Sequence, residues 1–256
     1  MIINNINPVI TKIGSLEIRY YGIIFALGFV IGYFFLRHYI KNGRLKNVST
    51  KKLDDLILYL IIGGVAGARL FYAIFYPPYL LFTSPLEIFM VWQGGLAFHG
   101  GLIGAIIAVY LFARKNKLKT LALFDALVIP AALGLAFGRI ANYTNHELYG
   151  PITSLPWCVV FKTVEGCRHP YQIYASITHF LTFLILLVVY KKSKKDGTTF
   201  WSFILTYGIF RFITDLFKVE LKFFGLGIGQ LVSIIMIIIG ILALLDKLPF
   251  KKKERN

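Results

Sequence analysis

The stretch YYGIIFALGFVIGYFFL, residues 20–36, is followed directly by RHYIKNGRLKNVSTKK, residues 37–52. The first stretch holds no charged residue, whereas the second holds six Lys and Arg residues. A helix needs roughly 20 mostly apolar residues to cross the hydrocarbon core of a bilayer. Loops on the cytoplasmic side of such a helix are rich in Lys and Arg. The two stretches together predict a membrane-spanning helix whose C-terminal end faces the cytoplasm.

The composition of the whole chain agrees with this interpretation. Of the 256 residues, 57% are apolar and only 16% are charged, although the formal net charge is +16. A soluble domain carries about 25% charged residues, and a nucleic-acid-binding protein spreads its basic residues over a polar surface. Two cysteines are too few for a small disulfide-rich secreted fold. We therefore expect an all-α integral membrane protein that forms a single transmembrane domain over residues 1–256.

Seven segments have the length and apolar character of membrane spans. They are residues 20–36, 56–75, 94–113, 121–138, 173–190, 200–217 and 226–245. Residues 1–19 lack the basic, apolar and small-residue regions of a removable signal peptide, so the first span is expected to stay in the protein.

Alternate connections between these spans carry 19 of the 28 basic residues. These residues are Arg37, Lys41, Arg44, Lys46, Lys51, Lys52, Arg114, Lys115, Lys117, Lys119, Lys191, Lys192, Lys194, Lys195, Lys247, Lys251, Lys252, Lys253 and Arg255. The positive-inside rule then predicts that the N-terminus is outside and the C-terminus is cytoplasmic. The lysine runs are interpreted as topology signals and contacts with anionic membrane lipids, and no nucleic-acid partner is expected.

The longest connection on the opposite side, residues 139–172, predicts a small extracytoplasmic head. It contains several prolines and glycines and both cysteines, Cys158 and Cys167. Two interpretations of the cysteines stay open: they pair in an oxidising compartment, or they are ordinary free thiols.

Ionisable residues at membrane depth are costly and indicate function. In the predicted orientation, the polar residues of five spans fall in the outer half of the membrane, and few lie in the inner half apart from Asp125 in the fourth span. They include Tyr20, Tyr21, Arg69, Tyr72, His99, Arg139, Asn142, Asn145, Glu147, Tyr207, Arg211 and Asp215. Arginine offers a planar donor fork that fits a phosphate, so a phospholipid headgroup is the expected ligand.

Structural interpretations of the same residues remain open. Arg211 would then pair with Asp215 one helical turn later, and Arg139 with Glu147. Arg69 would extend to the membrane interface. Glycines near His99 suggest bent backbone beside a cavity, whereas Gly63, Gly67 and Gly104 fit close helix packing.

The chain resembles the prolipoprotein diacylglyceryl transferase family at these same residues. GRIANYTNHELYG, residues 138–150, is similar to the family signature at Gly138, Arg139, Asn142, Asn145, Glu147 and Gly150. Six further segments follow in the family's order: YYGIIFALGF, GARLFY, FHGGLIG, HPYQIY, YGIFRFITDLF and GQLVSI. The departures are Ala141, Tyr143, Ala175, Asp215 and Lys218, where family members more often have other residues.

This resemblance implies a membrane enzyme that uses no cofactor. Its partners would be phosphatidylglycerol, whose sn-1,2-diacylglyceryl group is transferred, and a preprolipoprotein signal peptide, whose lipobox cysteine thiol accepts it. Glycerol phosphate would leave. The family is bacterial, and the expected location is the bacterial cytoplasmic membrane, which a multi-pass chain would occupy. No set of His, Cys and carboxylate residues has metal-ligand spacing, so no metal is expected.

Three catalytic residues follow from the chemistry. His99 is the candidate base for the acceptor thiol, because only a thiolate attacks well and imidazole exchanges protons near neutral pH. Arg139 and Arg211 would stabilise the charge that develops on the phosphate. Binding of phosphatidylglycerol is assigned to Tyr21, Gly100, Arg139, Asn142, Asn145, Glu147, Tyr207 and Arg211.

Two alternatives concern His99 and the class of protein. His99 would bind only phosphate or glycerol if an arginine or the lipid phosphate assisted ionisation of the thiol. A transporter for an anionic solute would also place arginines in the membrane, but with polar residues spread through its depth. A noncatalytic lipid-binding scaffold would tolerate loss of His99 and Arg139.

Overall fold

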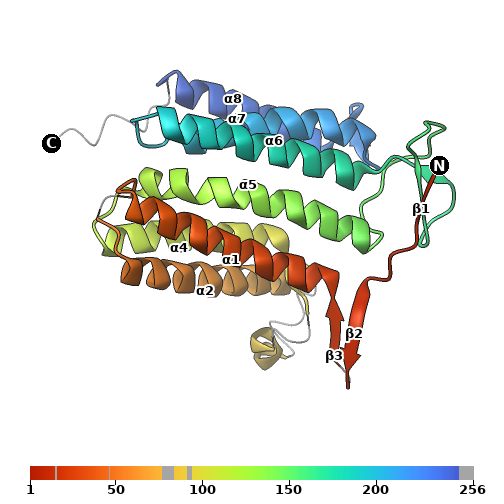
Figure 1. Cartoon of the computed structure of the whole chain (residues 1–256), viewed down its shortest axis with the longest axis horizontal. Helices are drawn as coiled ribbons and strands as arrows, with labels where there is room; N and C mark the ends of the chain where they lie inside the picture. Colours follow the sequence, from red (N-terminus) through yellow and green to blue (C-terminus); the bar gives the residue numbers. More distant parts are fainter. Residues whose placement is uncertain (15, 46, 77–83, 91–93, 248–256) are drawn as a thin grey trace. The chain divides into compact units, whose positions relative to one another are not determined.

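The computed structural model describes residues 1–14, 16–45, 47–76, 84–90 and 94–247 (Figure 1). The chain is mostly helical and divides into two compact units, one of Met1–Phe35 with Asp125–Asn256 and one of Leu36–Phe124. Part of the orientation prediction lies outside the described residues, namely Lys46, Lys251, Lys252, Lys253 and Arg255.

Each predicted span contains a helix. The helices are α1 (Tyr20–Lys41), α2 (Thr50–Phe75), α4 (Phe98–Lys115), α5 (Thr120–Thr144), α6 (Tyr171–Lys192), α7 (Thr198–Thr214) and α8 (Ile228–Leu244). Helix α4 begins four residues later than predicted and α8 two residues later. Two short 3-10 helices are η1 (Pro85–Phe89) and η3 (Asp215–Phe217), which continues α7. In the described part of the chain, six helices are long and apolar enough to cross a membrane, and α8 is a shorter apolar helix of 17 residues.

Several helices extend beyond the apolar segments that predicted them. Helix α2 begins at Thr50 rather than 56, because the Ser49 side chain caps it by accepting a hydrogen bond from the Lys52 backbone N–H at 3.2 Å. Helix α5 continues to Thr144 rather than 138. Hydropathy marks the part of a helix that lipid can cover, whereas capping residues decide where the helix begins and ends.

The described residues also form seven short strands that were not predicted from the sequence. They are β1 (Ile2–Asn4), β2 (Val9–Ile13), β3 (Leu16–Arg19), β4 (Val159–Phe161), β5 (Cys167–Arg168), β6 (Lys222–Phe223) and β7 (Leu226–Gly227). Strands β2 and β3 form an antiparallel hairpin, and so do β6 and β7. In the first hairpin, hydrogen bonds from Lys12 and then Arg19 lower the pKa of the Glu17 carboxyl. Strands of two to five residues are too short to produce a clear alternating pattern.

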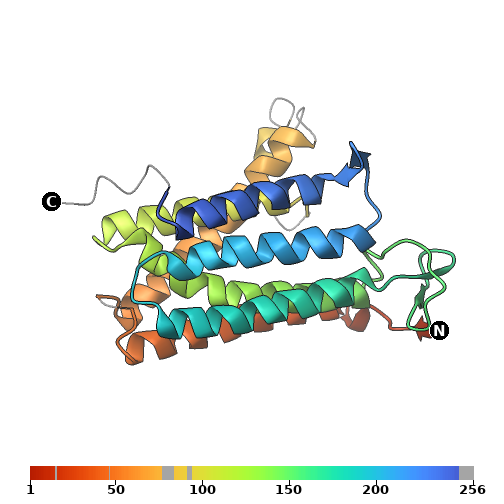
Figure 2. The same cartoon turned by 90° about the horizontal axis from the view of Figure 1, so that it is seen from above.

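The first unit contains helices α6, α7 and α8, which lie side by side in Figure 1 and Figure 2. Asp125 of α5 caps the start of α7: its carboxylate accepts the Gly197 N–H at 2.6 Å and the Phe200 N–H at 2.7 Å. Carboxylates near a helix N-terminus satisfy free N–H groups and the helix dipole. Asp125 therefore has a structural role in joining two helices.

The head of this unit forms at the end of α6 that is opposite the α6–α7 connection (Figure 2). Strand β1 pairs in parallel with β4, and β4 pairs with β5. Cys158 and Cys167 form a disulfide, which settles the alternative that the sequence left open. His146 is buried in the head, and its Nε2 lies 2.8 Å from the carbonyl oxygen of Ile6. The N-terminal strand is thus part of the head, together with residues of the 139–172 segment.

The second unit is built on α2 and α4, which pack closely through glycines. A side chain at Gly104 would overlap the carbonyl oxygen of Gly63, and one at Gly67 would overlap that of Gly100. The expected packing role of Gly63, Gly67 and Gly104 is confirmed. The two backbones approach because these positions lack a Cβ, as in other membrane helix pairs.

Candidate functional site

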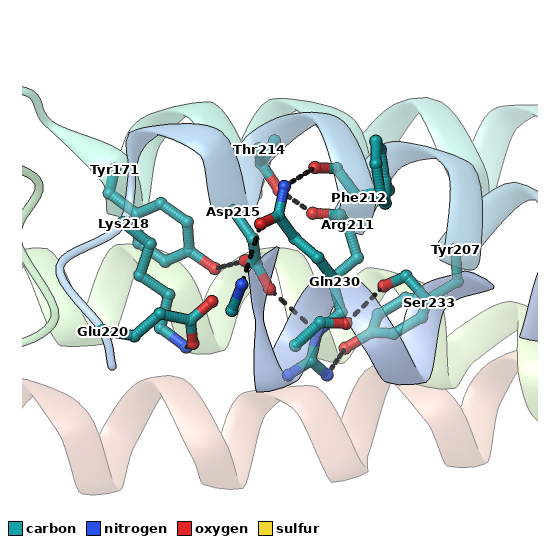
Figure 3. Close-up of polar contacts among 12 residues, drawn as sticks. Tyr171, Tyr207, Arg211, Phe212, Thr214, Asp215, Lys218, Glu220, Gln230 and Ser233 are labelled. Atoms are coloured by element: carbon teal, nitrogen blue, oxygen red, sulfur yellow. Dashed lines mark hydrogen bonds and ion pairs between the residues drawn. The ribbon is translucent and has the colours of Figure 1, made fainter. Parts of the chain in front are cut away.

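Arg211 lies near the C-terminal end of α7 and is held by two residues of its own helical face (Figure 3). Its Nε is 3.3 Å from Oδ2 of Asp215, and its Nη1 donates to the Tyr207 hydroxyl at 3.1 Å. Residues four apart are neighbours on a helix, so this spacing creates the cluster directly. The Arg211–Asp215 pair that the sequence left as an alternative therefore forms.

Asp215 is fixed from two other helices. The Tyr171 hydroxyl of α6 donates to its Oδ1 at 2.6 Å, and a side chain at Gly229 of α8 would overlap its carboxylate. Asp215 is 2% exposed and Tyr171 is also 2% exposed. A buried carboxylate is tolerated where charge partners and donors surround it, as they do here. Asp215, which is held in place by Tyr171, therefore orients the Arg211 guanidinium.

Arg139 of α5 approaches the same tyrosine from its ring face. Its guanidinium carbon is 5.7 Å from the centre of the Tyr171 ring, and the charges of Arg139 and Arg211 both act on Tyr171. Within the described residues, half-buried Arg139 makes no hydrogen bond and no ion pair, so the alternative pair with Glu147 is absent there. Two guanidinium groups converge on Tyr171, whereas Asp215 supplies one carboxylate. The cluster therefore keeps a positive charge that can bind an anion.

Further polar contacts hold the segment between the end of α7 and the start of α8 (Figure 3). Gln230 of α8 donates to the Phe212 carbonyl at 3.3 Å and accepts the Gly227 N–H at 3.0 Å. Lys218 and Glu220 form an ion pair at 2.9 Å. Since the Lys218 charge is neutralised by Glu220, the excess charge in this region comes from the two arginines.

The signature loop forms a second polar cluster after α5. The Nδ2 groups of Asn142 and Asn145 donate to the Glu147 carboxylate at 3.2 and 3.1 Å. Gln172 of α6 donates to the Glu147 carbonyl at 2.5 Å. Gly150 packs so closely that a side chain there would crowd His169 and the Phe217 carbonyl. Asn142, Asn145 and Glu147, which the sequence analysis expected to contact the headgroup, therefore form hydrogen bonds with one another.

His179 of α6 is buried beside the arginine cluster. It is 2% exposed, and its ring stacks on Tyr207 with centroids 5.2 Å apart and an interplanar angle of 14°. The structure therefore places His179 in packed surroundings.

Arg69 of α2, in the second unit, has a different environment. Its guanidinium donates to the carbonyl oxygens of Glu87 at 2.5 Å, Ile88 at 3.0 Å, Gly94 at 2.5 Å and Gly95 at 3.2 Å. Arg69 is 5% exposed, so it does not extend to an interface. Gly94 and Gly95 both adopt positive φ, which a glycine can do without strain. Arg69 therefore holds the bent backbone that the glycines before His99 predicted.

His99 and Gly100 lie in the first turn of α4 in this second unit. The His99 ring is exposed and lies 6.2 Å from the Phe71 ring, whereas Gly100 is buried against Phe71 and Gly67. Tyr21 is 39% exposed in the first turn of α1. Among the candidate residues, the structure brings Arg139, Tyr207 and Arg211 into one cluster, and Asn142, Asn145 and Glu147 into another.

Comparisons with known proteins agree with these motifs. The model of the prolipoprotein diacylglyceryl transferase family matches residues 8–245. A phosphatidylglycerol–prolipoprotein diacylglyceryl transferase of Geobacter sulfurreducens is 38% identical over 244 residues, covering 93% of this chain and 94% of the relative. An enzyme of the same name from Tolumonas auensis is 37% identical over 264 residues and covers 100% of both chains. The chain belongs to the prolipoprotein diacylglyceryl transferase family.

Two residues of this family member were not singled out by the sequence analysis. Tyr171 donates to Asp215 and lies beneath Arg139, and Gln172 holds the signature loop. Both lie within HPYQIY, a segment quoted for its resemblance but not for individual roles. The available signal was a Tyr and a Gln at the start of a predicted apolar helix, because a polar side chain that such a helix buries needs a partner. In the described residues, no group of three or more His, Cys, Asp or Glu side chains could hold a metal ion.

Proposed function

We propose that this protein is a multi-pass membrane enzyme that transfers the sn-1,2-diacylglyceryl group of phosphatidylglycerol to the lipobox cysteine of a preprolipoprotein. Membership of the prolipoprotein diacylglyceryl transferase family supports the reaction. The observation that carries the assignment to this site is the contact series in which Arg139 lies over the Tyr171 ring, Tyr171 donates to Asp215, and Asp215 pairs with Arg211. That arrangement suits a phosphodiester.

The proposed topology has seven spans with the N-terminus outside and the C-terminus in the cytoplasm. In the first unit, Lys195 of the α6–α7 connection pairs with Asp246, which follows α8. Figure 2 shows that connection at the end of the helices opposite the head. In the second unit, Lys115 donates to Tyr59 near the start of α2, whereas Arg69 lies near its other end. Basic connections and candidate site residues thus occupy opposite ends of the helices in each unit. The Cys158–Cys167 disulfide favours an extracytoplasmic location for the head, residues 139–172, within one transmembrane domain of residues 1–256.

The reaction is a substitution at the glycerol carbon that carries the phosphate. The cysteine sulfur forms a bond to that carbon, the carbon–oxygen bond breaks, and glycerol phosphate leaves with the bonding electron pair. The thiol proton goes to a base. No oxidant, metal or cofactor enters this balance, because the phosphate is already a good leaving group.

Arg139 and Arg211 are proposed to bind the phosphate and to stabilise the charge on the departing oxygen. A preorganised donor of this kind contributes about 3 kcal/mol to transition-state stabilisation. Tyr207 and Asp215 would hold Arg211 in position, and Arg139 has its guanidinium available because no residue of the described chain pairs with it.

His99 is proposed as the base that removes the thiol proton. Its exposed position in the first turn of α4 suits contact with a substrate, and the adjacent buried Gly100 brings α4 close to α2. Asn142, Asn145 and Glu147 would bind the glycerol headgroup as one hydrogen-bonded set, with each amide retaining a second N–H for the lipid. Tyr21 is proposed to bind phosphatidylglycerol at the outer surface of the membrane.

The proposed location is the bacterial cytoplasmic membrane. The basic connections would lie against anionic lipids on the cytoplasmic side, which explains the large net charge without a nucleic-acid partner.

The direct test uses purified protein in vesicles with phosphatidylglycerol and a lipobox peptide. We expect a thioether product, detected by its mass, and an equal amount of glycerol phosphate. A peptide with serine in place of the lipobox cysteine is the control and should give neither product. Folded protein that yields no thioether would contradict the proposal and would favour an anion transporter or a noncatalytic lipid-binding scaffold.

A further inference from the structure

His179 has two buried ring nitrogens without a hydrogen-bond partner in the described part of the chain. A neutral imidazole carries one N–H donor and one acceptor nitrogen. Leaving a buried donor unsatisfied destabilises a folded protein, so buried polar groups usually have a partner. Since the described residues supply none to His179, a bound molecule is a candidate partner.

The residues around His179 on α6 explain why it lacks a partner. Ala175, one turn earlier, has no polar side-chain atom. The Ser176 hydroxyl donates to the Ala136 carbonyl at 3.0 Å, and the Thr182 hydroxyl donates to the Thr178 carbonyl at 2.9 Å. The neighbouring hydroxyl groups are therefore already engaged.

His179 lies next to the arginine cluster. Its ring stacks on Tyr207, whose hydroxyl accepts a hydrogen bond from Arg211, and the charges of both Arg139 and Arg211 act on the imidazole. Helix α7 runs from the basic α6–α7 connection toward the head end. Tyr207 precedes Arg211 by one turn, about 6 Å along the helix. His179 thus lies beside the phosphate-binding arginines, on the side away from the head.

The structure of a phospholipid indicates which lipid group would lie beside His179. In a bilayer leaflet, the ester carbonyls of a diacylglyceryl lipid lie between the phosphate and the hydrocarbon. An ester carbonyl accepts hydrogen bonds but cannot donate them, so it matches the N–H of a neutral histidine.

We propose that the His179 N–H donates a hydrogen bond to an ester carbonyl of the lipid whose phosphate Arg139 and Arg211 bind. This inference rests on the proposed function and adds a polar contact that recognises the acyl linkage. His179 would position the glycerol carbon for attack without taking part in bond making or breaking.

The test compares two lipids that differ only in this linkage: ester-linked phosphatidylglycerol and its ether-linked dialkyl analogue. The ether lipid retains the phosphate, the headgroup and the chains, but it lacks the carbonyl acceptors. For the wild-type enzyme we expect kcat/KM to be about tenfold higher with the ester lipid, which is the effect of one buried hydrogen bond.

Two variants identify the donor. His179→Phe keeps a ring to stack on Tyr207 but removes the N–H, so it should lower kcat/KM for the ester lipid and leave the ether lipid unchanged. The ratio of the two would fall to about one. Thr182→Val is the matched control: Thr182 is equally buried on α6, but its hydroxyl is satisfied by its own helix. It should preserve the tenfold ratio.

The outcomes separate this inference from the proposed function. Equal rates with both lipids in the wild-type enzyme, or an unchanged ratio in His179→Phe, would overturn the inference and leave the transferase assignment intact. A loss that is the same for both lipids would show a purely structural role and would also overturn it. Should His179→Phe fail to fold, His179→Gln, which retains an N–H donor, must keep an ester preference. Absence of product with either lipid would overturn the proposed function and the inference together.

Discussion

Arg69 and Arg139 are both arginines in apolar helices, but their surroundings differ. Arg69 donates to four backbone carbonyls between residues 87 and 95 and is 5% exposed. Arg139 lies over the Tyr171 ring and makes no hydrogen bond or ion pair within the described residues. The chain supplies an acceptor to every nitrogen of the first guanidinium and leaves the second guanidinium available.

This difference separates a structural cation from a ligand-binding one. A guanidinium in a poorly hydrated environment needs acceptors, whether they come from the protein or from a substrate. Arg69 finds its acceptors in bent backbone, and Arg139 is positioned to find them in an anion. Sequence position alone did not distinguish them, because both lie near the outer ends of predicted spans.

The largest effect is expected from Arg139→Gln. We predict that kcat/KM falls by about 10²–10³-fold, because one preorganised donor to the developing charge is lost. The thermal midpoint in detergent should change little. Arg114→Gln is the matched control, because exposed Arg114 also lies 5.7 Å from a tyrosine ring, that of Tyr110, but near the basic end of α4. Activity of Arg139→Gln within tenfold of the wild-type value would contradict the comparison.

Arg69→Gln should affect stability rather than the chemical step. It would remove the charged hydrogen bonds that the buried guanidinium donates to four backbone carbonyls, and we expect the free energy of unfolding to fall by about 3 kcal/mol. Denaturant titration in mixed micelles measures this change. Arg69→Lys should recover little of it, since a single ammonium cannot reach carbonyls arranged around a planar fork. An Arg139→Gln protein that is destabilised as much as Arg69→Gln would remove the distinction between the two arginines.

A smaller effect is expected from Tyr171→Phe. This change removes the hydrogen bond to Asp215 and keeps the ring beneath Arg139, so Asp215 loses a donor and holds Arg211 less firmly. We expect about a tenfold decrease in kcat/KM with phosphatidylglycerol. Tyr143→Phe serves as the control, because the Tyr143 hydroxyl makes no hydrogen bond in the described residues. Equal activity of the two variants would argue against a positioning role for the Tyr171 hydroxyl.

Most of the helical fold could be predicted from the sequence. Each apolar segment that predicted a span contains a helix, because long apolar runs are a local signal. The short strands were missed. Strand β1 pairs with β4 across more than half of the chain, and such pairing depends on the disulfide-linked head rather than on the three residues of β1.

The candidate site was predicted in part. The sequence indicated five of the residues that lie in the two polar clusters. Arg139 and Arg211 belong to the arginine cluster, and Asn142, Asn145 and Glu147 form the second one. Tyr171 was not identified, because its hydroxyl meets Asp215 across 44 residues of sequence. Asp125 was grouped with polar residues at membrane depth, but its carboxylate caps α7 across 72 residues.

By itself, the sequence determined that this chain enters a membrane, where its helices lie and which residue types gather toward one end of them. Those properties depend on the apolar character and charge of consecutive residues. Only the tertiary structure decided which arginine is satisfied by the chain, which carboxylate anchors the cluster and which histidine is buried without a partner. These outcomes depend on acceptors supplied by distant segments, and a hydrogen bond requires its two atoms to lie within about 3 Å of each other.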